Sequence, residues 1–99
     1  MAVTATQSDG GKTLTIRVDG RFDFSAHDEF RAAYADSSAD RFVVDLAGLE
    51  FLDSSALGLL VLLREHAGGD AANVEILNCS TEVRRILTIA SFQRLFTIV

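Results

Sequence analysis

Residues 42–64 have the sequence FVVDLAGLEFLDSSALGLLVLLR, which combines a short apolar strand, a polar turn and a strongly apolar helix. The segment Asp53-Ser54-Ser55 marks the point where the turn becomes the helix. A serine at that point lies among the unpaired N–H groups of a first helical turn, at the positive end of the helix dipole. Such a position suits either a capping hydroxyl or a phosphate group.

Strand patterns on both sides of this segment predict a largely parallel sheet that follows an N-terminal hairpin. Residues 12–18 alternate apolar and polar side chains, and Gly10-Gly11 favours a tight turn before them. Residues 41–46 are almost continuously apolar, which is typical of a strand buried on both faces. Residues 20–24 are expected to form a loop. The expected strands are residues 1–9, 12–18, 41–46, 74–78 and 96–99.

Helical spacing of apolar residues predicts three helices, each with a recognisable start. Ser25, with Asp28 three residues later, approximates a capping box, and Ser54 or Ser55 begins the second helix, which Gly68-Gly69 ends. Ser80 is expected to cap the third helix, over residues 81–90. The expected inward residues are Ala26, Phe30, Ala33 and Tyr34 in the first helix, Ala56, Leu59, Leu60, Leu63 and Ala67 in the second, and Val83, Ile86, Leu87 and Ala90 in the third.

These elements together predict an α/β fold with a single domain over residues 1–99. About four to five strands form a mixed sheet, flanked by about three to four helices. The right-handed crossover rule places consecutive helices on a common side when strands are added in one direction.

Composition excludes several classes of protein. A net charge of −5 argues against nucleic acid as a partner, since binding phosphates requires a basic surface. The longest apolar run, residues 56–63, is far shorter than the ~20 residues that span a bilayer, so no membrane insertion is expected. Cys79 is the only cysteine, and with no signal peptide the sequence predicts a protein of the reducing cytoplasm.

The sequence offers little support for an enzyme. A serine hydrolase on an α/β sheet would use Gly-x-Ser-x-Gly, whereas residues 52–56 are Leu-Asp-Ser-Ser-Ala. The two candidate bases, His27 and His66, are expected on solvated helix faces. We therefore expect no catalytic residue, no cofactor and no metal site.

Two hypotheses remain for the pair Ser54 and Ser55. One of them caps the helix, which is worth about 1 kcal/mol. Alternatively, one of them is phosphorylated, and the added charge of about −1.5 to −2 changes the surface while the helix dipole keeps the domain folded. Leu57, Val61 and Leu62 add apolar surface beyond one buried face, which suits either a partner or a deeply wedged helix.

Several motifs carry a likeness to a known family. Residues 44–46 (Val-Asp-Leu) and 52–58 (Leu-Asp-Ser-Ser-Ala-Leu-Gly) match in order, and residues 20–23 (Gly-Arg-Phe-Asp) match a Gly-x-x-Asp motif that follows the second strand. Residues 83–87 and 92–96 match a last helix and a final turn. In these motifs the chain resembles the STAS domain, the family named for sulfate transporters and anti-sigma factor antagonists, whose fold is a small mixed sheet flanked by helices.

The resemblance implies an anti-sigma factor antagonist that acts by partner switching in bacterial transcription. In that family the serine after the signature aspartate, here Ser54, is phosphorylated by a partner that is both anti-sigma factor and serine kinase. The unphosphorylated form binds this partner and frees a sigma factor, the phosphorylated form is released, and a phosphatase resets it. The residues alone do not distinguish Ser54 from Ser55 as the acceptor.

The resemblance also implies a partner-facing surface. Ala56 stands where many members have glycine, which leaves the branch of the family open. The alternative is a STAS subunit that is not phosphorylated, such as the cytoplasmic partner of a membrane lipid transporter. The sequence does not determine the oligomeric state. The residues expected to bind the partner are Asp23, Asp53, Ser54, Ser55, Ala56 and Leu57.

Overall fold

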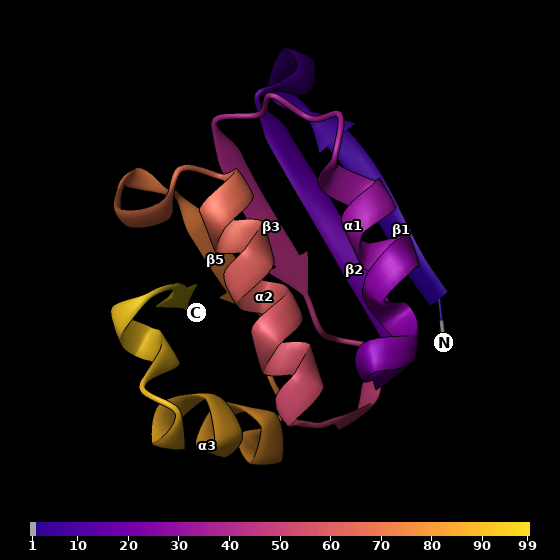
Figure 1. Cartoon of the computed structure of the whole chain (residues 1–99), viewed down its shortest axis with the longest axis vertical. Coiled ribbons are helices and arrows are strands. Elements are labelled where there is room, and N and C mark those ends of the chain that lie inside the picture. Colours follow the sequence, from indigo (N-terminus) through magenta and orange to yellow (C-terminus); the bar gives the residue numbers. More distant parts are fainter. Residues whose placement is uncertain (1) are drawn as a thin grey trace.

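The computed structural model describes residues 2–99, and it places two helices side by side over one face of a mixed sheet (Figure 1). The strands are β1 (Ala2–Ser8), β2 (Thr13–Phe22), β3 (Arg41–Asp45), β4 (Leu49–Leu52), β5 (Val74–Leu77) and β6 (Thr97–Ile98). The α-helices are α1 (His27–Tyr34), α2 (Ser54–His66) and α3 (Thr81–Ile89). Within residues 2–99, no helix combines the length and the apolar character that crossing a bilayer requires.

The sheet has the order β1-β2-β3-β5-β6, and β4 pairs with β2 outside this path. β1 is antiparallel to β2, which confirms the predicted hairpin, and the pairs β2–β3, β3–β5 and β5–β6 are all parallel. α1 and α2 lie on the same face of the sheet, as the crossover rule predicts for strands added in one direction (Figure 1). The predicted fold class is confirmed.

The hydrophobic core lies between this face of the sheet and the helices. Leu14, Ile16 and Val18 of β2 are at most 2% exposed, as their alternation with polar residues predicts. Phe42, Val43 and Val44 of β3 are all buried, which confirms a strand covered on both faces. The core contributions of the helices are Ala26, Phe30 and Tyr34 near α1, Ala56, Leu59, Leu60 and Leu63 in α2, and Val83 and Leu87 in α3.

The prediction of a loop at residues 20–24 was wrong in its first half. β2 continues to Phe22, and its end pairs in parallel with β4, a strand that the sequence did not predict. The Gly20 N–H donates to the Gly48 carbonyl oxygen over 2.8 Å. A side chain at Gly48 would collide with the carboxylate of Asp19, so glycine permits this close approach.

The start of the first helix also differs from the prediction. Ser25 does not form a capping box with Asp28; it lies in a 3₁₀ turn, Phe24–Ala26, and α1 begins at His27. The cap of this turn is Asp23, whose carboxylate accepts the Ser25 N–H. An aspartate placed two residues before the serine supplies a stronger acceptor at the helix entry than the hydroxyl does.

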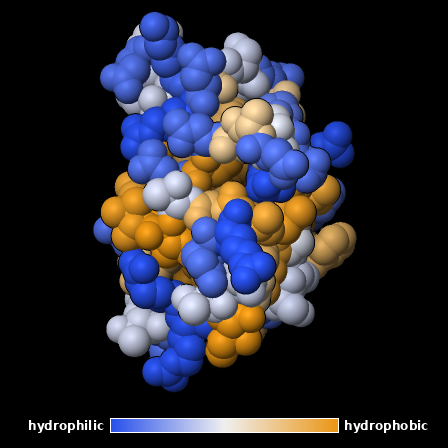
Figure 2. Space-filling view, turned by 90° about the vertical axis from the view of Figure 1, so that its left-hand side faces the viewer, coloured by the Kyte–Doolittle hydropathy of each residue, from blue (hydrophilic) through white to orange (hydrophobic). Residues whose placement is uncertain are grey.

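In α3 the predicted cap is confirmed, because Ser80 Oγ accepts the Val83 N–H over 3.1 Å. The predicted inward face is only half correct: Val83 and Leu87 are buried, whereas Ala90 and Ile86 are exposed, Ile86 by 38%. Ile89 is 79% exposed on the same helix. Figure 2 faces the side of the molecule that carries α3 and shows apolar surface there between hydrophilic side chains.

Candidate functional site

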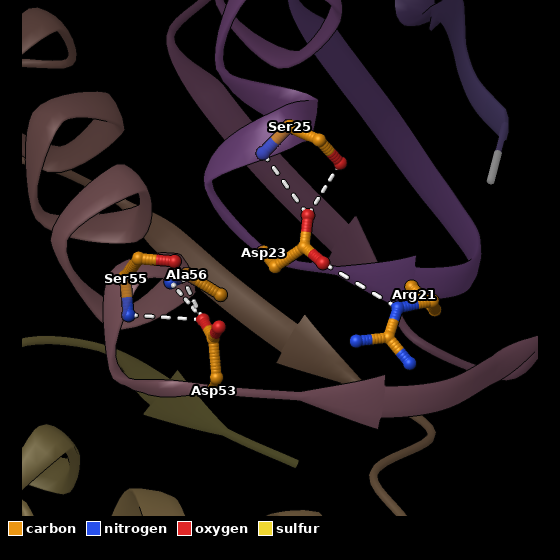
Figure 3. A network of polar contacts seen from close by, with 6 residues as sticks. All are labelled: Arg21, Asp23, Ser25, Asp53, Ser55 and Ala56. Carbon is orange, nitrogen blue, oxygen red and sulfur yellow. Dashed lines mark hydrogen bonds and ion pairs between the residues drawn. The ribbon is translucent and has the colours of Figure 1, made fainter.

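Two similar turns lie next to each other where β2 and β4 end. Phe22 pairs with Leu52, so the segments Asp23-Phe24-Ser25 and Asp53-Ser54-Ser55 leave the sheet in parallel (Figure 3). Each begins with an aspartate and carries a serine two residues later. The predicted site residues Asp23, Asp53, Ser54 and Ser55 are therefore brought to one edge of the molecule.

Asp53 is the N-cap of α2. Its Oδ1 accepts the N–H of Ser55 over 3.0 Å and the N–H of Ala56 over 3.2 Å. The same oxygen accepts the Ser55 hydroxyl over 2.6 Å. The hypothesis that Ser54 or Ser55 caps the helix is therefore wrong, because the carboxylate of Asp53 already binds the unpaired N–H groups of the first turn.

Asp23 repeats this arrangement on the neighbouring turn. Its Oδ1 accepts the N–H of Ser25 over 3.0 Å and also the Ser25 hydroxyl, and its Oδ2 pairs with Arg21 Nε over 3.4 Å. The Ser25 hydroxyl is the main reason why the pKa of Asp23 lies below its usual value, with a smaller contribution from Arg21. Asp23 is consequently a charged group at neutral pH, held in a fixed position.

The two serines of the signature differ in availability. Ser55 is half-buried and its hydroxyl is bound to Asp53. Ser54 is exposed at the first position of α2, and among residues 2–99 its hydroxyl has no hydrogen-bond partner. Only Ser54 presents a hydroxyl that is free to react without breaking a contact of the helix cap.

Two exposed aromatic residues, Phe24 and Phe51, lie beside the two turns and form an apolar rim. Phe24 occupies the position in its turn that Ser54 occupies in the other, and its side chain is 66% exposed. Phe51, the residue before Leu52 in β4, is 40% exposed, and the Arg21 guanidinium lies 4.2 Å from the centre of its ring. Sequence analysis missed both, although an aromatic side chain beside a polar turn signals surface contact.

The remaining predicted site residues lie in the first turn of α2 and differ in exposure. Ala56 is fully buried, so its side chain offers no surface to a partner, and its N–H is bound to Asp53. Leu57 is half-buried and packs against the core, as does Val61. Leu62 remains 48% exposed. The excess apolar surface of α2 is thus mostly packed, with Leu62 as the exception.

His27 borders this edge through Phe24, whereas His66 lies at the far end of α2. His27 stacks on Phe24 with 5.3 Å between ring centres, and His66 contacts the ring of Tyr34 at 4.9 Å. In residues 2–99 neither histidine is hydrogen-bonded to Ser54, and no group of three potential metal ligands occurs. His27 is half-buried, which differs from the fully solvated position that the sequence suggested.

The comparison with known proteins agrees with this geometry. The family model described as "Mlab, STAS domain" matches residues 5–98, and the signature residues 52–58 lie at the junction of β4 and α2. The chain belongs to the STAS family. A STAS-domain containing protein of Pseudomonas aeruginosa is 54% identical over 99% of this chain and 99% of its own.

Solved STAS structures show the same fold. The anti-sigma factor antagonist SpoIIAA in its unphosphorylated form matches with a TM-score of 0.75 and 24% identity, over 99% of this chain and 87% of its own. SpoIIAA of Bacillus in the phosphorylated form matches with a TM-score of 0.75 and 20% identity, over 99% of this chain and 91% of its own. An antisigma-factor antagonist STAS domain of Rhodobacter sphaeroides is 28% identical, with a TM-score of 0.60 over 78% of this chain and 85% of its own.

Proposed function

We propose that this STAS domain is an anti-sigma factor antagonist whose binding to its partner is switched by phosphorylation of Ser54. In the unphosphorylated form it binds an anti-sigma factor that is also a serine kinase, and phosphorylation of Ser54 releases it. The observation that supports this proposal best is the contrast between the two serines. Ser54 is exposed and free of hydrogen bonds within residues 2–99, whereas Ser55 is bound to the cap.

The helix cap determines what a phosphate on Ser54 does. The N–H groups of Ser55 and Ala56 are already bound by Asp53, so the phosphate does not replace them and stays at the surface. The helix dipole favours the added charge, while the neighbouring carboxylate of Asp53 directs it outward. The fold is therefore retained, and the local surface becomes strongly negative.

The electrostatic effect on a complex is large. A phosphate carries about −1.5 to −2 charges, and a partner carboxylate ~5 Å away repels each charge by about 3 kcal/mol at an effective dielectric of 20. Screening by salt reduces this value. Even half of one such repulsion lowers affinity by roughly tenfold, and half of two such repulsions, about 3 kcal/mol, lowers it by roughly a hundredfold.

The apolar rim supplies the contact that the phosphate interrupts. Phe24 lies in the turn beside Ser54, Phe51 lies three residues before Ser54 in β4, and exposed aromatic side chains are frequent anchors of protein–protein interfaces. Asp23, held by Ser25 and Arg21, and Leu57 complete the surface that we assign to the partner. A serine phosphatase is the second partner, because the released form must be dephosphorylated before it binds again.

The proposal is tested by incubating the protein with its anti-sigma kinase and ATP and locating the phosphate by mass spectrometry. We expect a single phosphate on Ser54, its loss in Ser54→Ala and its retention in Ser55→Ala, the matched control. Affinity for the kinase, measured by isothermal titration calorimetry, should fall on the order of a hundredfold after phosphorylation.

Two outcomes contradict the proposal. Phosphate found only on Ser55 would show that the free hydroxyl of Ser54 is not the acceptor. A complex that is equally tight with and without the phosphate would instead support the alternative, a STAS subunit that binds its partner, for example a membrane lipid transporter, without a covalent switch.

A further inference from the structure

A cleft of about 330 Å³ lies between α1 and α2, outside the edge that carries Ser54. Its lining residues are His27, Arg31 and Tyr34 from α1 and Leu62 and His66 from α2. The three residues of α1 are four and three positions apart, and the two residues of α2 are four positions apart, so each set lies on one face of its helix. The two helices lie side by side (Figure 1). The volume falls at the lower end of the range of small-molecule sites, roughly 300–1,000 Å³.

The cleft is cationic in a chain of net charge −5. None of its five lining residues is acidic. The Arg31 side chain is exposed, and among residues 2–99 it makes no ion pair, unlike Arg17, Arg21, Arg41 and Arg64. An unpaired guanidinium facing a cleft provides two or more hydrogen-bond donors for an anion.

The other polar groups of the cleft have free hydrogen-bonding capacity. His27 Nδ1 contacts Asp28 over 3.1 Å and His66 Nε2 contacts the Ser37 carbonyl oxygen over 3.1 Å, so in the neutral rings these nitrogens donate and the second nitrogens are acceptors. The Tyr34 side chain is almost fully buried, and its hydroxyl makes no hydrogen bond within residues 2–99. In these residues every fully buried side-chain polar atom has a hydrogen-bond partner, so the Tyr34 hydroxyl is not fully buried. The hydroxyl oxygen therefore reaches the open cleft.

One wall of the cleft is apolar. Leu62 is 48% exposed, and it is the part of the apolar excess of α2 that the core does not cover. The rings of Tyr34 and His66, with 4.9 Å between their centres, pack on each other at the edge of the same cleft. A bare inorganic anion would use Arg31 but leave this apolar wall in water, and a neutral apolar molecule would leave Arg31 without a partner.

We propose that the cleft between α1 and α2 is a binding site for a small organic anion, a carboxylate or phosphate monoester on a compact apolar body. Arg31 and the Tyr34 hydroxyl bind the anionic group, and Leu62 packs on the apolar body, with the rings of His27 and His66 beside it. None of the lining residues belongs to the cap of α2, and His27 connects the cleft to the apolar rim through its contact with Phe24.

The test uses the full chain and four probes, phenyl phosphate, benzoate, phenol and inorganic phosphate, with the imidazole signals of His27 and His66 followed by NMR. We expect saturable shifts of both histidines with phenyl phosphate or benzoate at low-millimolar concentration, and much weaker effects of phenol and inorganic phosphate. Arg31→Gln should weaken binding of the responding probe on the order of tenfold, as loss of a charge-assisted hydrogen bond predicts.

Arg85→Gln is the matched control, because Arg85 is an exposed arginine of α3 that makes no ion pair within residues 2–99 and does not line the cleft. It should leave binding unchanged. The proposal is overturned if neither aryl anion gives saturable shifts, or if Arg85→Gln weakens binding as much as Arg31→Gln. Equal affinity for inorganic phosphate would also overturn it, because the apolar wall would then have no role.

Discussion

Three consecutive residues at the start of α2 have three different roles. Asp53 binds two backbone N–H groups and the Ser55 hydroxyl, Ser55 is fixed by that contact, and Ser54 has no structural contact of its side chain within residues 2–99. A chemically reactive hydroxyl can stand at this position because the adjacent carboxylate satisfies the helix start. In the proposed switch, stability and signalling are thereby assigned to different side chains.

This division predicts the stability of two neighbouring variants. Asp53→Ala should lower the free energy of unfolding by about 1 kcal/mol, within the 0.5–2 kcal/mol that loss of an N-cap costs. Ser54→Ala should change it by less than about 0.5 kcal/mol, since an exposed side chain without contacts is removed. Urea unfolding followed by circular dichroism measures both. An equal loss in Ser54→Ala would mean that Ser54 is a structural residue.

The sequence predicted where α2 begins but not which residue caps it. Asp53, Ser54 and Ser55 are all favourable N-cap residues, so local preference cannot rank them. The choice depends on where β4 ends, and β4 exists only because the extension of β2 pairs with it. Information on the cap therefore comes from the tertiary structure and not from the three residues themselves.

The elements that the sequence predicted well carry their signal within one segment, as a periodic repeat or, in β3, as a continuous apolar run. α2, α3 and the alternating part of β2 each show a repeat within one segment, and all three were predicted near their observed bounds. β4 is four residues long and shows no clear alternation, since Glu50 and Phe51 are both exposed. Its register is set by β2, a partner distant in sequence, which explains why it was missed.

A pair of residues in α3 tests this view of a helix with one buried face. Leu87 is fully buried, whereas Ile89, two residues later, is 79% exposed. Leu87→Ala should lower the free energy of unfolding by about 2–5 kcal/mol, because it leaves a cavity in the core. Ile89→Ala, the matched control on the same helix, should cost about 0.5 kcal/mol or less. Similar losses for both variants, measured by urea unfolding, would contradict the observed packing of α3.

For the whole molecule, the sheet face opposite the helices carries a set of charged contacts that ties strands together. Arg41 of β3 is hydrogen-bonded to Glu75 of β5, and Asn78 donates to Asp45 of β3 over 2.9 Å. Arg41, Asp45 and Glu75 alternate along β3 and β5 with residues of the core, so they lie on the other face, and Asn78 directly follows β5. The sequence showed these charges, but their partners are separated by more than thirty residues.

These contacts set the response of the fold to acid. The pKa of Glu75 is lowered mainly by the hydrogen bond from Arg41, and that of Asp45 mainly by the hydrogen bond from Asn78. A carboxyl group whose pKa is lower in the folded state stabilises the fold above its unfolded pKa, near 4, and this contribution disappears as pH falls through the folded value. The free energy of unfolding should therefore decrease below about pH 4.

Glu75→Gln identifies the source of this dependence. At pH 7 it should lower the free energy of unfolding by about 1 kcal/mol or less, since partly exposed ion pairs contribute little. Between pH 5 and pH 2 (roughly the range over which such carboxyl groups titrate) the variant should lose less stability than the unsubstituted protein. The control is Glu50→Gln, which changes an exposed residue of β4 without an ion pair within residues 2–99 and leaves the Arg41–Glu75 contact intact. If Glu75→Gln and the unsubstituted protein lost stability in parallel over this range, the Arg41–Glu75 contact would not contribute to acid sensitivity, and Asp45 and Asp23, whose pKa values are also lowered, would have to account for it.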